Sequence, residues 1–225
     1  MRFDEERRVG GRRIDRWAAA LALLGAVAVV IANVVAARLN DDVGFFADTI
    51  SDLAAGRYAW VLDTALILFA IGVAAIGVAL WPQELDGWRW RTGSTLAILV
   101  AAAIVVIALY EEYGDGDTGG TTIHLEVVVA MALAFTLSAW LIAPGLTRVG
   151  SGWATFSSLM GLLWLLLGLA FFFLAPDDLD GLVERLAAGA LVIWAVGMAW
   201  LVSRERRARS TWAGRGNAAT TRRPG

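Results

Sequence analysis

The sequence predicts an all-α fold, a polytopic membrane helix bundle with six transmembrane helices. Three observations lead to this prediction. Of the 225 residues, 58% are hydrophobic and only 18% are charged, which is unlike the composition of a soluble domain. The apolar residues gather in long runs that can cross a bilayer. Basic and acidic residues alternate between the loops that join these runs.

Each predicted span follows from the length of an apolar run. A helix needs about 20 apolar residues to cross a hydrocarbon core of about 30 Å. Six stretches qualify, at residues 17–39, 59–81, 93–110, 123–144, 153–175 and 181–202. The chain therefore divides into an arginine-rich tail (1–16), a transmembrane domain (17–202) and a second arginine-rich tail (203–225), which we expect to be disordered. The short connection at 145–152 predicts that the fourth and fifth spans are antiparallel neighbours.

Charge predicts the orientation, because arginines in tails and short loops stay in the cytoplasm. Both tails are rich in arginine, and the second and fourth loops carry Arg89, Arg91 and Arg148. The other three loops are acidic, with Asp41, Asp42, Asp48, Asp52, Glu111, Glu112, Asp115, Asp117, Asp177, Asp178 and Asp180. We therefore expect a multi-pass protein of the cell membrane with cytoplasmic N and C termini.

Polar residues within the spans are few, and they lie in the predicted outer half of the membrane. Such residues are costly at membrane depth and call for a partner or a role. Together with two residues of the first outer loop they predict an outward-facing polar cavity lined by Asn33, Ser51, Asp52, Asp63, His124, Glu126, Glu184 and Arg185. The alternative is that these side chains are hydrated in the headgroup layer. We expect Arg185 to pair with Asp63 or Glu126, since a buried guanidinium cannot lose its charge.

Residue types exclude several site chemistries. The chain has no cysteine, so disulfides, thiolate metal sites and cysteine nucleophiles are excluded. Its only histidine is His124, whereas a zinc site generally needs three protein ligands. The acidic, glycine-rich loop around Asp115 and Asp117 has only a weak calcium pattern. We therefore expect no metal and no cofactor. The arginine-rich tails are interpreted as topology anchors at anionic lipid, not as a nucleic-acid site.

Small and aromatic residues complete the predicted bundle. We expect glycines within the spans to allow close helix approach, at Gly72, Gly77, Gly161, Gly168, Gly189 and Gly197. We expect an aromatic belt at the span ends, formed by Trp60, Trp81, Trp88, Trp90, Trp153 and Tyr110.

Three short motifs carry a resemblance to a known family. Ile50-Ser51-Asp52-Leu53 follows the first span, His124 opens a central span, and Glu184-Arg185 precedes Trp194 in the last. Over about residues 20 to 203 the chain resembles the prokaryotic domain-of-unknown-function family number 998, which consists of six-helix integral membrane proteins. The resemblance implies fold and topology and no established activity. This chain departs from the family pattern by placing Ala54 and Ala55 before Gly56.

The sequence favours a non-enzymatic function, in which the polar cavity binds, senses or carries a small molecule or lipid headgroup. Membrane lipids are the expected partners. One alternative is an intramembrane lipid hydrolase that uses Ser51, His124 and an acid. Another is a structural or interaction protein whose polar residues only stabilise the bundle. The distance between Ser51 and His124 discriminates: hydrogen-bonding distance favours the enzyme, and a wide separation with Arg185 facing a carboxylate favours binding.

Overall fold

The structure, a computed structural model, is an all-helical bundle. It describes residues 2–40, 44–55, 57–83, 85–110, 123–176 and 178–220. The described elements are α1 (Arg2–Leu39), α2 (Ile50–Ala55), α3 (Ala59–Leu80), the 3₁₀ turn η1 (Trp81–Gln83), α4 (Gly87–Leu109), α5 (Ile123–Leu146), α6 (Ser151–Phe173) and α7 (Asp180–Thr220). Every helix except α2 contains a segment long and apolar enough to cross a membrane. The prediction of six transmembrane helices is confirmed.

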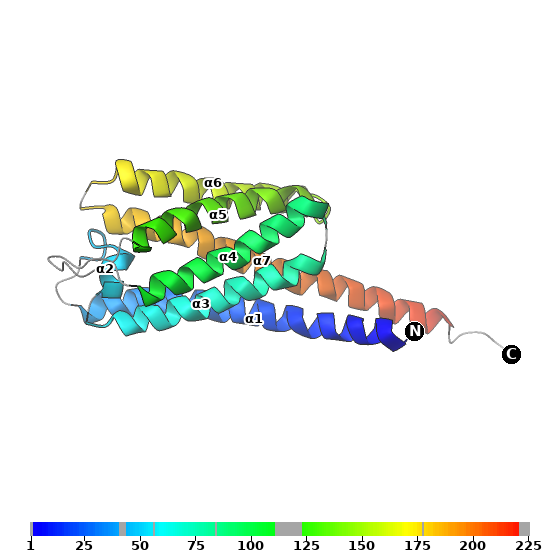
Figure 1. Cartoon of the computed structure of the whole chain (residues 1–225). Helices are drawn as coiled ribbons and strands as arrows, with labels where there is room; N and C mark the ends of the chain where they lie inside the picture. The colour runs from blue at the N-terminus through cyan, green and yellow to red at the C-terminus, as the bar shows by residue number, and fades with distance from the viewer. Residues whose placement is uncertain are drawn as a thin grey trace.

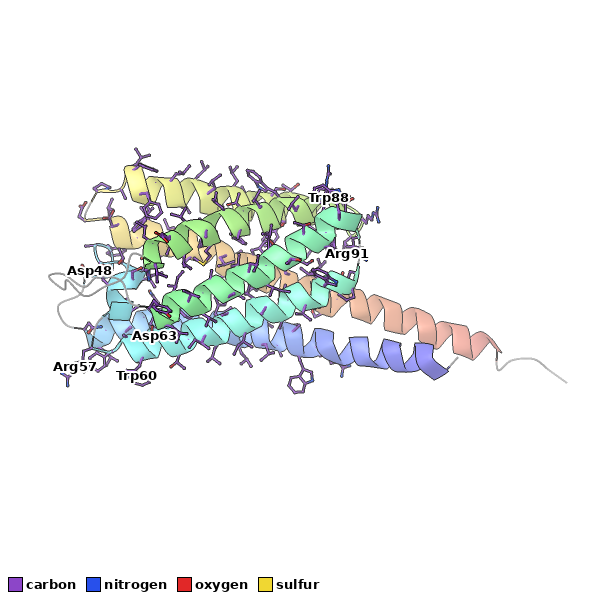
Figure 2. The ribbon with its side chains drawn as sticks, viewed as in Figure 1. Asp48, Arg57, Trp60, Asp63, Trp88 and Arg91 are labelled. Atoms are coloured by element: carbon purple, nitrogen blue, oxygen red, sulfur yellow. The ribbon has the colours of Figure 1, made fainter. Side chains whose placement is uncertain are left out.

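Several helices are longer than the predicted spans: α1 begins at Arg2, α7 continues to Thr220, and α4 begins before its predicted start. The predicted third span begins at residue 93, but α4 begins at Gly87, whose φ of 56° is accessible to glycine. The first turns of α4 include Trp90, which is fully buried and donates its indole N–H to the carbonyl of Leu80 at 2.6 Å. Trp90 is therefore a core residue, and its assignment to the aromatic belt was wrong. Trp60 and Trp88 do lie exposed at opposite ends of the bundle (Figure 2).

The six long helices form a closed ring. Each packs against its neighbour in the order α1, α3, α4, α5, α6, α7, and α7 returns to α1. Both termini lie at one end of the bundle, and α2 lies at the opposite end, which we call the α2 end (Figure 1). Many large apolar side chains on the outside of the ring are exposed, as expected for helices that face lipid. The chain is thus a multi-pass membrane protein.

Glycines explain part of the close packing. A Cβ added to Gly72 would lie 2.7 Å from the Cα of Ala22 on α1, and one added to Gly161 would lie 3.0 Å from the Cβ of Ala139 on α5. Gly77 and Gly197 are similarly close to neighbouring helices. Gly168 and Gly189 are different, because a Cβ there would meet nothing within 4 Å. The prediction that these two allow close approach was wrong.

Buried hydroxyls link the helices in the interior. Ser138 on α5 donates to the carbonyl of Gly93 at 2.8 Å. Trp194 of α7 donates to Ser157 Oγ at 3.0 Å, and Ser157 donates to the carbonyl of Ala139 at 2.8 Å. These bonds satisfy polar groups where no water is available and fix the rotation of each helix.

Candidate functional site

The candidate site is at the α2 end, where the N-terminal parts of α2, α5 and α7 meet. These three segments carry Ser51, His124 and Glu184. Ser51 Oγ lies 3.3 Å from His124 Nε2 and 3.3 Å from Glu184 Oε1. The second oxygen of Glu184 accepts the backbone N–H of Ile50, so this carboxylate also secures the start of α2.

His124 is buried, and its ring orientation is set by a backbone group. Its Nδ1 lies 3.0 Å from the carbonyl oxygen of Tyr110, the residue that ends α4. A carbonyl oxygen only accepts hydrogen bonds, so Nδ1 carries the proton. In the neutral ring Nε2 is then an acceptor that faces the Ser51 hydroxyl.

Arg185 lies beside this cluster and has several partners. Its Nε donates to Asn33 Oδ1 at 3.0 Å, and its Nη1 donates to the carbonyls of Asp48 at 2.7 Å and Gly181 at 2.9 Å. The guanidinium carbon also lies 4.5 Å from the centre of the Phe45 ring, a cation–π contact. Arg185 therefore joins α1, α7 and the segment before α2.

The segment before α2 is attached to α7 by backbone bonds as well. Gly181 N–H donates to the carbonyl of Ala47 at 3.0 Å, and Leu182 N–H donates to that of Phe46 at 2.9 Å. The first N–H groups of a helix have no partner within it, so this segment satisfies two of them on α7. The approach is so close that a Cβ on Gly181 would lie 2.0 Å from the Asp48 carbonyl oxygen.

A cavity of about 450 Å³ begins at this site and extends into the bundle. All six long helices and α2 contribute to its wall. Its polar lining comes from Asn33, Ser51, His124, Glu184 and Arg185, and the other lining side chains are aliphatic, aromatic or glycine, among them Trp164 with its indole N–H. On α7 the lining extends from Glu184 to Ile193, a depth of about 14 Å at 1.5 Å per residue. Gly168 and Gly189 line the cavity, so a side chain at either position would project into it.

The structure brings five of the eight predicted site residues together and leaves three apart. Asp52 is exposed and accepts bonds from the N–H and hydroxyl of Thr49. Glu126 is exposed, and Asp63, on α3 near the α2 end, is not among the residues that line the cavity (Figure 2). Neither carboxylate is a partner of Arg185, which is held instead by an amide and two backbone carbonyls. The predicted pairing of Arg185 with Asp63 or Glu126 was therefore wrong.

Sequence reasoning missed the partners that act through the backbone or through an aromatic ring. The carbonyls of Asp48 and Tyr110 carry no signal in the sequence, and neither does the ring of Phe45. Within the described part of the chain, no group of three His, Cys, Asp or Glu side chains could hold a metal ion. The weak calcium pattern at Asp115 and Asp117 lies outside the described residues.

The fold and the site define a polytopic membrane protein with an internal, largely apolar cavity that is polar at one end. A comparison with protein families agrees with this class. Residues 8–201 match the family described as Protein of unknown function (DUF998), and the chain belongs to this family. Of the residues that carried the resemblance, Ser51, His124 and Glu184 meet at the cavity, and Trp194 packs in the core against Phe135. No curated protein matches the chain, and no solved structure does.

Proposed function

We propose that the protein binds an amphipathic small molecule or lipid, with its polar group at the Ser51, His124 and Glu184 cluster and its apolar part in the cavity. The observation that carries the proposal is the one-sided polarity of the cavity, whose polar lining comes from side chains at the α2 end. A volume of about 450 Å³ lies within the usual range of small-molecule sites, which are mostly apolar with a few converging polar groups. The Glu184 carboxylate can accept hydrogen bonds from a headgroup, and the Ser51 hydroxyl can donate or accept them.

The polar end of the cavity faces the cell exterior in this proposal. Support comes from the arginines of both tails, which favour a cytoplasmic location, and from the acidic loops at the α2 end. The protein would then sense or carry an amphiphile from the outer side of a prokaryotic cytoplasmic membrane.

A second candidate function is hydrolysis of a lipid ester. It is favoured by the contact between Ser51 Oγ and His124 Nε2 at 3.3 Å, the distance that the sequence singled out as discriminating. Ser51 Oγ would attack the ester carbonyl carbon while its proton passes to Nε2; the alcohol would leave with that proton, and water would hydrolyse the acyl serine. The Tyr110 carbonyl would hold the imidazole in the required tautomer.

Two features make binding the leading proposal. The distance of 3.3 Å is long for a hydrogen bond from a hydroxyl. The acid Glu184 contacts the serine, whereas the acid of a hydrolase triad contacts the far nitrogen of the histidine. Here that nitrogen lies 3.0 Å from the backbone carbonyl oxygen of Tyr110.

The binding proposal is tested by mass spectrometry of the detergent-purified protein. We expect an amphiphile to remain bound after detergent washing, and we expect Glu184→Gln to lose most of it. The control is Leu159→Ala, a change at an exposed position on α6 outside the cavity. A washed wild-type protein that carries no amphiphile would contradict binding.

The hydrolase candidate is tested by labelling with a fluorophosphonate, which reacts with activated serines. Labelling that Ser51→Ala abolishes and that Ser203→Ala, at an exposed position, retains would establish a nucleophilic serine. If the fluorophosphonate does not label the protein and no amphiphile remains bound to it, the result favours a structural role.

A further inference from the structure

The cavity wall between α1 and α7 contains side chains that are also exposed on the outside of the bundle. Arg185, Gly189 and Ile193 follow one another at intervals of four residues and share one face of α7. The first of them bonds Asn33 of α1, so this face is turned toward α1. On α1, Val30 and Val34 lie beside Asn33 within one helical turn.

Exposure shows where the cavity reaches the surface. Val30, Val34 and Ile193 line the cavity, yet they are 54%, 47% and 54% exposed. Met131 and Trp164, which also line the cavity, are buried, and the lining residues Phe45 and Phe172 are 39% exposed, so the largest exposures place the mouth at Val30, Val34 and Ile193. Gly189 lies between these residues and has no atom within 4 Å of an added Cβ, so no side chain fills this place. We call the opening between Val30, Val34, Gly189 and Ile193 the lateral opening.

The lateral opening lies between segments of α1 and α7 that are long and apolar enough to cross a membrane. Val34 is level with the Asn33–Arg185 contact, whereas Val30, Gly189 and Ile193 lie deeper in the bundle, and Ile193 is about 12 Å further along α7 than Arg185. Half of a hydrocarbon core of about 30 Å is about 15 Å, so the cavity and its opening span the depth of a single leaflet. An apolar passage at this depth meets the acyl chains of the bilayer.

We propose that the occupant of the cavity is a bilayer lipid of the leaflet on the α2 side, with one acyl chain inserted through the lateral opening between α1 and α7. The chain lies against Gly189 and Gly168, while the headgroup stays level with Ser51 and Glu184. This inference rests on the proposed binding function and adds the ligand class and the route. A water-soluble amphiphile would instead have to reach the cavity past the polar cluster.

The experiment uses a fluorescent label inside the cavity, which the absence of native cysteine makes simple. Gly168→Cys is labelled with bimane and reconstituted in phosphatidylcholine vesicles whose acyl chains are brominated and therefore quench on contact. We expect loss of emission comparable to that of a bimane on Leu162→Cys, an exposed position of α6 outside the cavity. If labelling at Gly168 disturbs folding, Val128→Cys on α5 provides a second position that lines the cavity.

A second change tests the route. Gly189→Phe places a ring in the lateral opening and is expected to restore most of the emission at Gly168, leaving Leu162 quenched. The matched control, Leu186→Phe, lies on the exposed face of α7 and is expected to leave both signals unchanged. The proposal is overturned if Gly168 stays bright while Leu162 is quenched, or if Gly189→Phe has no effect. Retention of an amphiphile by the washed protein in either case would show that binding holds and only the lateral route fails.

Discussion

Gly181 offers the sharpest test of how the site is assembled. In Gly181→Ala the new Cβ would lie 2.0 Å from the Asp48 carbonyl oxygen and 2.6 Å from Arg185 Nη1, so the segment before α2 must move away. Optimal contact between heavy atoms is about 3.5 Å, which makes the required shift more than 1 Å and enough to break hydrogen bonds. The bonds at risk are Gly181 N–H to Ala47, Leu182 N–H to Phe46, and Arg185 Nη1 to Asp48.

The expected loss of stability follows from these three bonds. Two neutral backbone bonds contribute about 1 kcal/mol each and the charged one about 2 kcal/mol, so the free energy of unfolding should fall by about 4 kcal/mol if all are lost. Relaxation of the segment reduces this value, and helix propensity returns about 0.5 kcal/mol or more for glycine to alanine. We therefore expect a net loss of about 2 to 3 kcal/mol.

The assay is reversible unfolding of the detergent-solubilised protein, with Gly189→Ala as the matched control on the same helix. The control adds a methyl group where nothing lies within 4 Å and should be neutral or slightly stabilising. If the free energies of unfolding of Gly181→Ala and Gly189→Ala agree within about 0.5 kcal/mol, the hydrogen bonds between α7 and the segment before α2 do not contribute to stability as described.

Three further predictions concern the partners of Arg185, the buried Ser157 and the topology. In a double-mutant cycle, Arg185→Ala and Asn33→Ala should show a coupling energy of about 1 to 3 kcal/mol. Arg185→Ala and Asp63→Ala should be additive within about 0.5 kcal/mol. Coupling to Asp63 together with additivity for Asn33 would mean that Asp63 is the partner of Arg185 after all. Ser157→Ala leaves the buried Trp194 N–H without its acceptor and should lower the free energy of unfolding by about 1 to 3 kcal/mol in the same assay. The exposed Ser203→Ala should cost less than about 0.5 kcal/mol. Equal effects of the two changes would mean that the Trp194–Ser157 bond is not formed. Reporter fusions should give cytoplasmic signals after Gly87 and Gly150 and exterior signals after Gly119 and Asp180, and a cytoplasmic signal from Gly119 would reverse the scheme.

The six helices were predictable because the property that defines them is local. A run of about 20 apolar residues can only be a helix if it crosses hydrocarbon, whatever surrounds it, since its backbone groups must bond to one another. Even so, the start of α4 was placed too late at residue 93. Arg89 and Arg91 were interpreted as loop residues, but they lie on the exposed face of the first turns of α4, while Trp90 lies on its buried face.

The sequence predicted which residues belong to the candidate site better than which contacts they make. Rare polar residues near span ends pointed to Asn33, Ser51, His124, Glu184 and Arg185, and the structure places all five at one cavity. The same reasoning also selected Asp63, Glu126 and Asp52, which do not line it. Distance from a span end was the same kind of evidence for both groups, so it could not separate them.

Composition, length and charge order determined the class of protein, the number of spans and the short list of polar residues. Tertiary structure alone decided how each helix is rotated about its axis, and that rotation assigns every contact in the site. Gly72 touches a neighbouring helix while Gly189 faces an empty cavity, although both are glycines within apolar spans. Arg185 donates its hydrogen bonds to two backbone carbonyls and an amide, and not to the carboxylate of Asp63 or Glu126. Every residue has a carbonyl, so only the folded chain selects which ones an arginine meets.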